Sequence, residues 1–188
     1  MRRAAIAILL CPALLLLGAG APARAEIPSL ALRVLPLTGV TVPHQQLAGY
    51  RASLPVGLGL EVLYTPRFSL VLDVATSWHG GGPGGDGSLQ LSGLQVLGRW
   101  RWPGTGWAPF VQAGAGGYQA EVDEGRGDDQ YGGVGLCLGG GVEIPLTERF
   151  LVQAEVRSNW VNGEESVHHR ELWIGHTQAM GWLVYRLP

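Results

Sequence analysis

The sequence predicts an all-β protein, an eight-stranded antiparallel up-and-down transmembrane β-barrel that follows a cleaved signal peptide. Three observations lead to this fold class. Beyond the N-terminal segment there is no run of about 18 apolar residues, so no transmembrane helix is predicted. Instead, segments of about ten residues alternate between apolar and polar positions. The connections between these segments are alternately tight and longer, as in outer-membrane barrels with an even number of strands.

The N-terminal stretch "MRRAAIAILLCPALLLLGAGAPARA" has the three parts of a secretory signal. Arg2 and Arg3 form a positive start, residues 4–17 are apolar, and residues 23–25 form an A-x-A cleavage site. The apolar run is shorter than the roughly 18–20 residues that a membrane-spanning helix needs. We therefore expect cleavage before Glu26. The expected organisation is a signal peptide, residues 1–25, followed by one outer-membrane barrel domain, residues 26–188.

The chain contains few residues that could hold a metal or cofactor. Removal of the signal would remove Cys11 and leave Cys137 alone, and one thiol cannot form an intramolecular disulfide. The histidines occur without an H-x-H or HExxH spacing, at His44, His79, His168, His169 and His176. The sequence therefore predicts no cofactor and no metal site.

Eight segments alternate strongly enough to be predicted as strands. They are residues 29–40, 54–65, 67–79, 88–102, 107–121, 131–146, 149–162 and 171–187. Tight turns follow the second, fourth and sixth, near Pro66, at 103–106 and at 147–149. Longer, polar or glycine-rich connections are expected at 42–51, 80–87, 123–130 and 163–170. The tight turns are predicted to face the periplasm and the longer loops the cell exterior.

The two faces of these strands differ in a way that indicates which one meets lipid. In the stretch 132–160, one face carries Val134, Leu136, Leu138, Val142, Ile144, Phe150, Val152, Ala154, Val156 and Trp160. The other carries glycine, Cys137 and charged or amide side chains. A narrow eight-stranded barrel has room inside only for side chains, which favours glycine and mutually paired polar groups. The apolar face is therefore predicted to contact lipid and the polar face to fill the lumen.

Aromatic residues lie at both ends of the apolar face. Phe68 and Trp78 are ten residues apart in one strand, and Phe150 and Trp160 are ten apart in another. Ten tilted residues rise about 25 Å, the height of the lipid-facing band between aromatic girdles. The predicted girdle residues are Tyr64, Phe68, Trp78, Trp100, Trp102, Trp107, Phe150, Trp160, Trp173 and Tyr185.

The inward face carries charges of both signs in nearly equal number. Unpaired charges in a narrow lumen would be costly, so we expect them to pair. The predicted lumen network is Arg33, Glu61, Asp73, Arg99, Arg101, Glu143, Glu155, Arg157 and Arg186, and Gln95, Gln112 and Gln153 lie on the same face.

The net charge and the lack of lysine exclude two other functional classes. The formal net charge is −2 and the isoelectric point is near 6.2, whereas a nucleic-acid-binding protein needs clustered positive charge. All thirteen basic residues are arginine, and a phosphate-binding P-loop requires a lysine after its glycines. "GGGPGGDG" is therefore interpreted as a loop.

The last four predicted strands contain "WAPFVQAGAGGY", "YGGVGLCLGGGVEIPLTERFLVQAEVR" and "MGWLVYRL". They show a resemblance to the small OmpA/OmpX-like outer-membrane β-barrel proteins. It implies the barrel domain alone, in the outer membrane of a Gram-negative cell. The expected partners are outer-membrane lipid, lipopolysaccharide and the outer-membrane insertion machinery, and the expected state is a monomer. Leu187 stands where such barrels usually have an aromatic residue.

The sequence leaves the specific role open. The first hypothesis is an integral barrel with a side-chain-filled polar lumen and a structural or surface-interaction role through four external loops, without enzymatic activity. A second is a lipid A-modifying acyl hydrolase, for which Ser158, His168 and Glu171 could form a triad. A third is a soluble lipocalin-like ligand binder, because such barrels also alternate. In one expected loop, Arg126-Gly127-Asp128 could be an adhesive tripeptide, and its acidic residues, Asp123, Glu124, Asp128 and Asp129, could hold Ca²⁺ without an EF-hand pattern.

Overall fold

The computed structural model describes residues 29–45, 47–82, 85, 87–102, 104, 106–123, 128–165 and 171–187. The side chains of residues 34–38, 128, 165, 171 and 172 are not part of this description. The predicted signal peptide lies outside the described residues, as do Glu124, Arg126, Gly127, His168 and His169. Within the described part of the chain, no helix is long and apolar enough to span a membrane.

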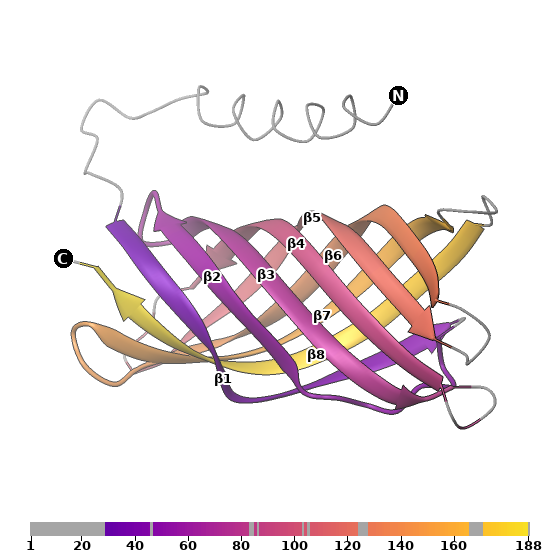
Figure 1. The fold of residues 1–188 in the computed structure, drawn as a ribbon. Coiled ribbons are helices and arrows are strands. Elements are labelled where there is room, and N and C mark those ends of the chain that lie inside the picture. The colour runs from indigo at the N-terminus through magenta and orange to yellow at the C-terminus, as the bar shows by residue number, and fades with distance from the viewer. Residues whose placement is uncertain are drawn as a thin grey trace.

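Eight antiparallel strands form one closed barrel in which each strand pairs with the next and β8 pairs with β1. The strands run steeply tilted around the barrel (Figure 1). Their bounds are β1 Ser29–Gln45, β2 Pro55–Leu63, β3 Phe68–Gly81, β4 Gly87–Arg101, β5 Ala108–Asp123, β6 Asp128–Pro145, β7 Phe150–Glu165 and β8 Glu171–Arg186. The predicted all-β, antiparallel up-and-down barrel of eight strands is thus confirmed.

The barrel has two different ends. At the turn end lie the connections 64–67, 102–107 and 146–149, the start of β1 and the end of β8. At the opposite end, which we call the loop end, lie the other four connections. Two of the tight turns are closed in the same way, because Thr65 and Thr147 accept backbone hydrogen bonds from the residues two and three positions later through their hydroxyls.

The connections at the loop end are shorter than the sequence predicts. β5 and β6 remain paired as far as Asp123 and Asp128, and β7 continues to Glu165. The polar composition of these residues predicts a loop. They form strands instead, because the neighbouring strand supplies hydrogen-bond partners for their backbone groups. The wall therefore extends past Trp78 and Trp160 at this end.

The first connection is also not a free external loop. Backbone hydrogen bonds join Arg51 to Gly80 and Gly82 to Gly49. These bonds hold the segment against the loop end of β3. The Nδ1 atom of His79 lies 2.8 Å from the carbonyl oxygen of Arg51. The segment is thus held in place as part of the loop end of the barrel.

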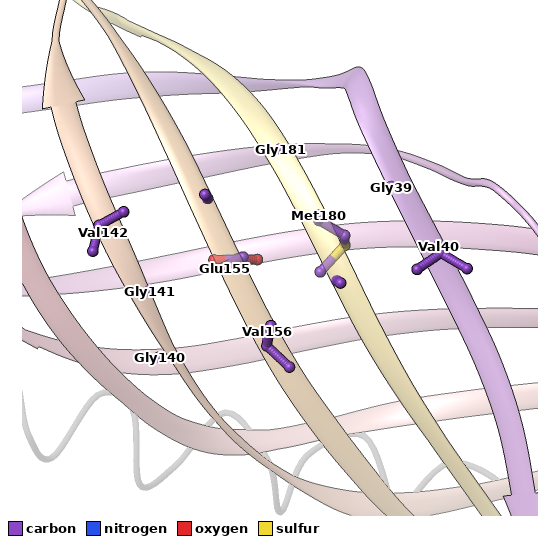
Figure 2. A pocket seen from close by; sticks show the side chains of 11 residues that line it. Gly39, Val40, Gly140, Gly141, Val142, Glu155, Val156, Met180 and Gly181 are labelled. Atoms are coloured by element: carbon purple, nitrogen blue, oxygen red, sulfur yellow. The ribbon is translucent and has the colours of Figure 1, made fainter.

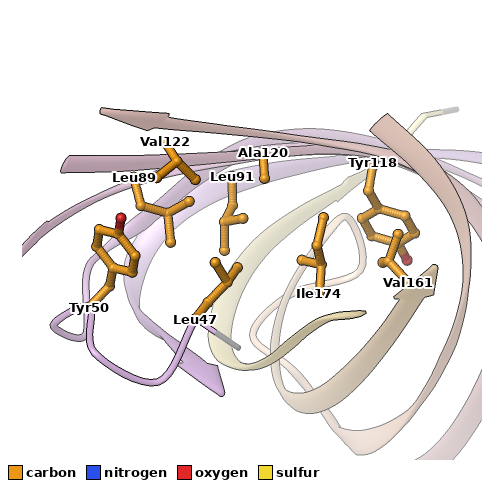
Figure 3. Close-up of a cluster of buried hydrophobic side chains, with 9 residues drawn as sticks. All are labelled: Leu47, Tyr50, Leu89, Leu91, Tyr118, Ala120, Val122, Val161 and Ile174. Atoms are coloured by element: carbon orange, nitrogen blue, oxygen red, sulfur yellow. The ribbon is translucent and has the colours of Figure 1, made fainter. Parts of the chain in front are cut away.

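Apolar side chains close the lumen at the loop end. A buried cluster, which we call the loop-end cluster, includes two residues from the first connection and seven from the strands (Figure 3): Leu47, Tyr50, Leu89, Leu91, Tyr118, Ala120, Val122, Val161 and Ile174. A second buried cluster lies nearer the turn end, formed by Ala31, Leu151, Met180, Trp182 and Val184. Polar side chains share the inward face with both clusters, since Glu61 is paired in register with Ala31 and buried Asn159 lies two residues from Val161.

Candidate functional site

Charged side chains fill the middle of the barrel. Four arginines and four carboxylates from six of the strands are almost completely buried there: Arg33, Arg99, Arg101, Arg157, Glu61, Asp73, Glu143 and Glu155. The structure brings together eight of the nine residues predicted to form a lumen network. Their four positive and four negative formal charges balance, so the group is neutral as a whole.

Glu155 of β7 lies at the centre of this network. Its carboxylate is 3.0 Å from Nη2 of Arg33, 3.1 Å from Nη2 of Arg99 and 2.7 Å from Nη2 of Arg157. The indole Nε1 of Trp182 donates a further hydrogen bond of 2.7 Å to the same carboxylate. Glu155 therefore connects residues from β1, β4, β7 and β8.

The other three carboxylates complete the pairing. Both oxygens of Asp73 accept hydrogen bonds of 2.8 Å from Nη1 of Arg33, and one of them lies 3.0 Å from Nη2 of Arg157. Glu61 pairs with Arg99 at 3.3 Å and also with Arg101. Glu143 lies 3.2 Å from Nη2 of Arg101 and 3.5 Å from Nη1 of Arg99. Each buried carboxylate thus contacts two or three guanidinium groups, which offsets the free energy of removing these charges from water.

Buried amides and aromatic rings surround the charges. Gln112 accepts from Arg99 Nη2 at 2.7 Å, and Gln95 accepts from Arg157 Nη1 at 3.0 Å. The guanidinium of Arg33 lies 4.2 Å from the ring centroid of Trp182, and that of Arg99 lies 4.1 Å from that of Phe110. Neither ring is among the residues predicted from the sequence, although both occupy the same alternating positions as the inward charges, which is the signal that identifies them.

Glycine makes room for this network along β6. A Cβ atom added at Gly139 would lie 2.7 Å from Cβ of Arg157 on the paired position of β7. Any larger residue would displace the arginine. The inward glycines that distinguish this strand in the sequence therefore create space for charged neighbours.

Arg186 does not join the network, which corrects its predicted role. It is the last residue of β8, its side chain is exposed, and it makes no ion pair with any described residue. Its backbone instead pairs with Arg149 in the turn between β6 and β7. The alternation assigns it correctly to the inward face, but the strand ends there, at the mouth of the lumen.

The predicted girdle residues lie at the two ends of the outer wall. Those at the turn end are Tyr64, Phe68, Trp100, Trp102, Trp107, Phe150 and Tyr185, and those at the loop end are Trp78, Trp160 and Trp173. The rings of Phe150 and Tyr185 contact each other across β7 and β8, with centroids 5.0 Å apart and planes tilted by 44°. Between the two groups the outer wall exposes large aliphatic side chains, among which Leu136 is 66% exposed.

A shallow hollow interrupts this apolar wall where β6, β7, β8 and β1 lie side by side (Figure 2). Its volume is about 470 Å³, and its lining consists mainly of glycine, alanine and valine. Glu155 also contributes to the lining, but its carboxylate is held by the arginines inside the barrel. The hollow therefore presents an apolar surface without a free polar side chain.

The residues suggested for catalysis are not brought together by the described structure. Ser158 lies on the outer face, where its hydroxyl is 3.0 Å from that of Thr177. His168 and the side chain of Glu171 lie outside the described residues. Among the described residues, no three His, Cys, Asp or Glu side chains form a group that could hold a metal ion. Cys137 is free and buried.

No known protein family matches the chain by sequence, and no curated protein does so either. Solved structures are similar in fold. Neisserial surface protein A (NspA) superposes with a TM-score of 0.66 at 13% identity, covering 87% of this chain and 99% of that one. The outer membrane protein OprG from Pseudomonas aeruginosa has a TM-score of 0.61 at 12% identity, covering 85% and 96%.

Ail, the attachment invasion locus protein of Yersinia pestis, gives a TM-score of 0.56 at 13% identity, covering 85% of this chain and 97% of that one. The similarity thus extends over nearly the full length of each of these barrels. The chain has the fold of the small eight-stranded outer-membrane β-barrel proteins.

Proposed function

We propose that the protein is an integral outer-membrane barrel, closed to solutes, with a structural or surface-interaction role at its loop end. One observation carries this proposal: the barrel is charged inside and apolar outside. A water-soluble protein rarely exposes a continuous apolar surface of this extent, whereas lipid contact requires one. The fold shared with NspA, OprG and Ail supports the same conclusion.

Closure of the lumen argues for a role other than solute passage. The paired charges occupy the centre, and the loop-end cluster covers them on one side. An eight-stranded barrel has room inside only for side chains. We infer that the surface presented at the loop end, rather than a channel, carries the function.

The proposed surroundings are outer-membrane lipid on the wall and lipopolysaccharide around the loop end, with the turn end in the periplasm. We expect the barrel to be inserted as a monomer by the outer-membrane insertion machinery after export by a cleaved signal peptide. The alternation of tight turns and longer connections supports this orientation.

The two other hypotheses have less support. An acyl hydrolase needs a base beside its serine, whereas the described partner of Ser158 is the hydroxyl of Thr177. A lipocalin-like protein binds its ligand in an apolar interior, whereas the interior of this barrel is occupied by ion pairs. We therefore propose that the protein is not an enzyme.

Cell fractionation tests the main proposal. The mature protein should be found with the outer membrane and migrate differently on a gel with and without heating. Recovery of folded protein from the periplasm without detergent would contradict it.

A further inference from the structure

The turn end of the lumen contains an open hollow. Its volume is about 350 Å³. Residues from β1, β2 and β4 to β8 line it, together with the β2–β3 and β4–β5 turns. The side chains that matter here are Arg101, Trp107, Ala108, Glu143, Leu151 and Arg186.

This hollow lies inside the ring of strands. Arg101, Glu143 and Leu151 are buried side chains of the inward face, and all three line it. Lipid headgroups lie outside the wall, so a ligand that reaches these side chains must come from the aqueous phase at the turn end.

Among the described side chains that line it, the hollow carries one positive charge in excess. The eight buried charges of the lumen balance, and Glu143 is already paired with Arg99 and Arg101. Arg186 adds a further guanidinium at the mouth, with no ion pair to any described residue.

Arg101, the second arginine that lines the hollow, uses only part of its guanidinium group in ion pairs. All ion pairs of Arg101 with Glu61 and Glu143 use its Nη2 atom, and its Nε has no hydrogen-bond partner. The nearby turns carry further exposed charge, from Arg67 and Arg149 against Glu148. The surroundings of the hollow are therefore positive on balance.

We propose that this hollow binds one carboxylate from the aqueous phase, held between Arg186 and Arg101. Guanidinium groups match the planar geometry of a carboxylate and form stronger hydrogen bonds to it than neutral donors do. Trp107 and Leu151 provide apolar walls for the carbon chain that bears it. The source can be a small free acid or the acidic side chain of a peptide, which share this chemistry.

The test is an NMR titration of the refolded, ¹⁵N-labelled full barrel in detergent micelles. Sodium acetate replaces sodium chloride stepwise, so that the ionic strength stays constant. The indole N–H signal of Trp107, assigned with Trp107→Phe, reports on the hollow. We expect a saturable shift. Loss of one charged hydrogen bond should weaken acetate binding about tenfold or more in Arg186→Gln.

Two variants make the result specific. Arg149→Gln removes an exposed arginine that is joined to Arg186 through the backbone but does not line the hollow, and it should bind acetate as the parent does. Ala108→Leu keeps both arginines and fills the mouth, so it should abolish the shift. Heat-modifiable migration confirms that each variant is folded.

The outcomes separate the ligand sources and decide the proposal. An amidated peptide with one aspartate that binds more tightly than acetate identifies a protein ligand, and equal affinity identifies a small acid. A shift that does not saturate, or one weakened equally in Arg149→Gln and Arg186→Gln, would show general charge screening and overturn the proposal. None of these results depends on the orientation of the barrel in a membrane.

Discussion

Trp182 donates a hydrogen bond of 2.7 Å from its indole nitrogen to Glu155, the carboxylate that also contacts three arginines. The two residues lie on the adjacent strands β8 and β7 and both point into the lumen. This tryptophan therefore belongs to the charged interior, whereas the other six lie toward the two ends of the barrel.

Trp182→Phe should keep the packing against Arg33 and lose only the hydrogen bond to Glu155. Hydrogen bonds to charged groups contribute about 1.5–3 kcal/mol, so the free energy of unfolding should fall within that range. Urea titration of the refolded barrel in lipid vesicles measures it. A change below about 0.5 kcal/mol would mean that the indole nitrogen contributes little to the network.

Glu155→Leu should destabilise the barrel by about 3–5 kcal/mol, because it leaves buried arginines without their shared partner. Glu155→Gln keeps the shape and serves as the matched control for volume. Combining Glu155→Leu with Arg157→Met should recover part of the loss, since an absent pair is less unfavourable than an unpaired charge. If Glu155→Leu were neutral in the same urea titration, the carboxylate would not be buried in the lumen.

Val156 occupies the opposite face of β7 and is 54% exposed, about midway between Phe150 and Trp160. Val156→Arg places a charge in the middle of the lipid-facing band, which should cost about 2–4 kcal/mol. Val156→Leu should have no measurable effect. The yield of heat-modifiable barrel in vesicles gives the comparison. Equal yields for the two variants would contradict lipid contact at this position.

Leu47→Ala tests closure at the loop end. Loss of this buried side chain should reduce stability by about 2–5 kcal/mol. Conductance in planar bilayers should nevertheless remain negligible in both the parent and the variant, because the ion pairs still block the lumen below the cluster. Steady channel currents in the parent protein would refute the closed-barrel proposal.

Epitope tags at Gly85 and Gly104 test orientation. Gly85 lies between β3 and β4 at the loop end, and Gly104 lies between β4 and β5 at the turn end. An antibody should label the Gly85 tag on intact cells and the Gly104 tag only after the outer membrane is permeabilised. The reverse pattern would place the turn end outside.

The sequence by itself determined which face of each strand is buried and how many strands there are. Val134 and Cys137, or Val156 and Glu155, are assigned to opposite sides by their parity alone, because successive side chains in a strand point to opposite faces. The girdle residues followed from the same rule and from the rise per residue. These properties depend only on neighbouring residues along one strand, so the sequence pattern of that strand is sufficient to predict them.

Only the tertiary structure decided which inward residues meet. Arg33 pairs with Asp73, 40 residues away, and with Glu155, 122 residues away. Parity gives the face of a residue but not its height in the barrel, which depends on the register of every strand pair and on closure of β8 against β1.

The same reason explains the residues whose placement differed from expectation. Arg186 occupies an inward-facing position, as the network residues do, but it lies at the turn end of the barrel, where β8 ends. Leu47 belongs to a connection that the sequence predicts to be external, yet it is buried in the loop-end cluster. Where a strand stops and what covers its end depend on neighbours that are distant in sequence, so they are fixed only when the barrel closes.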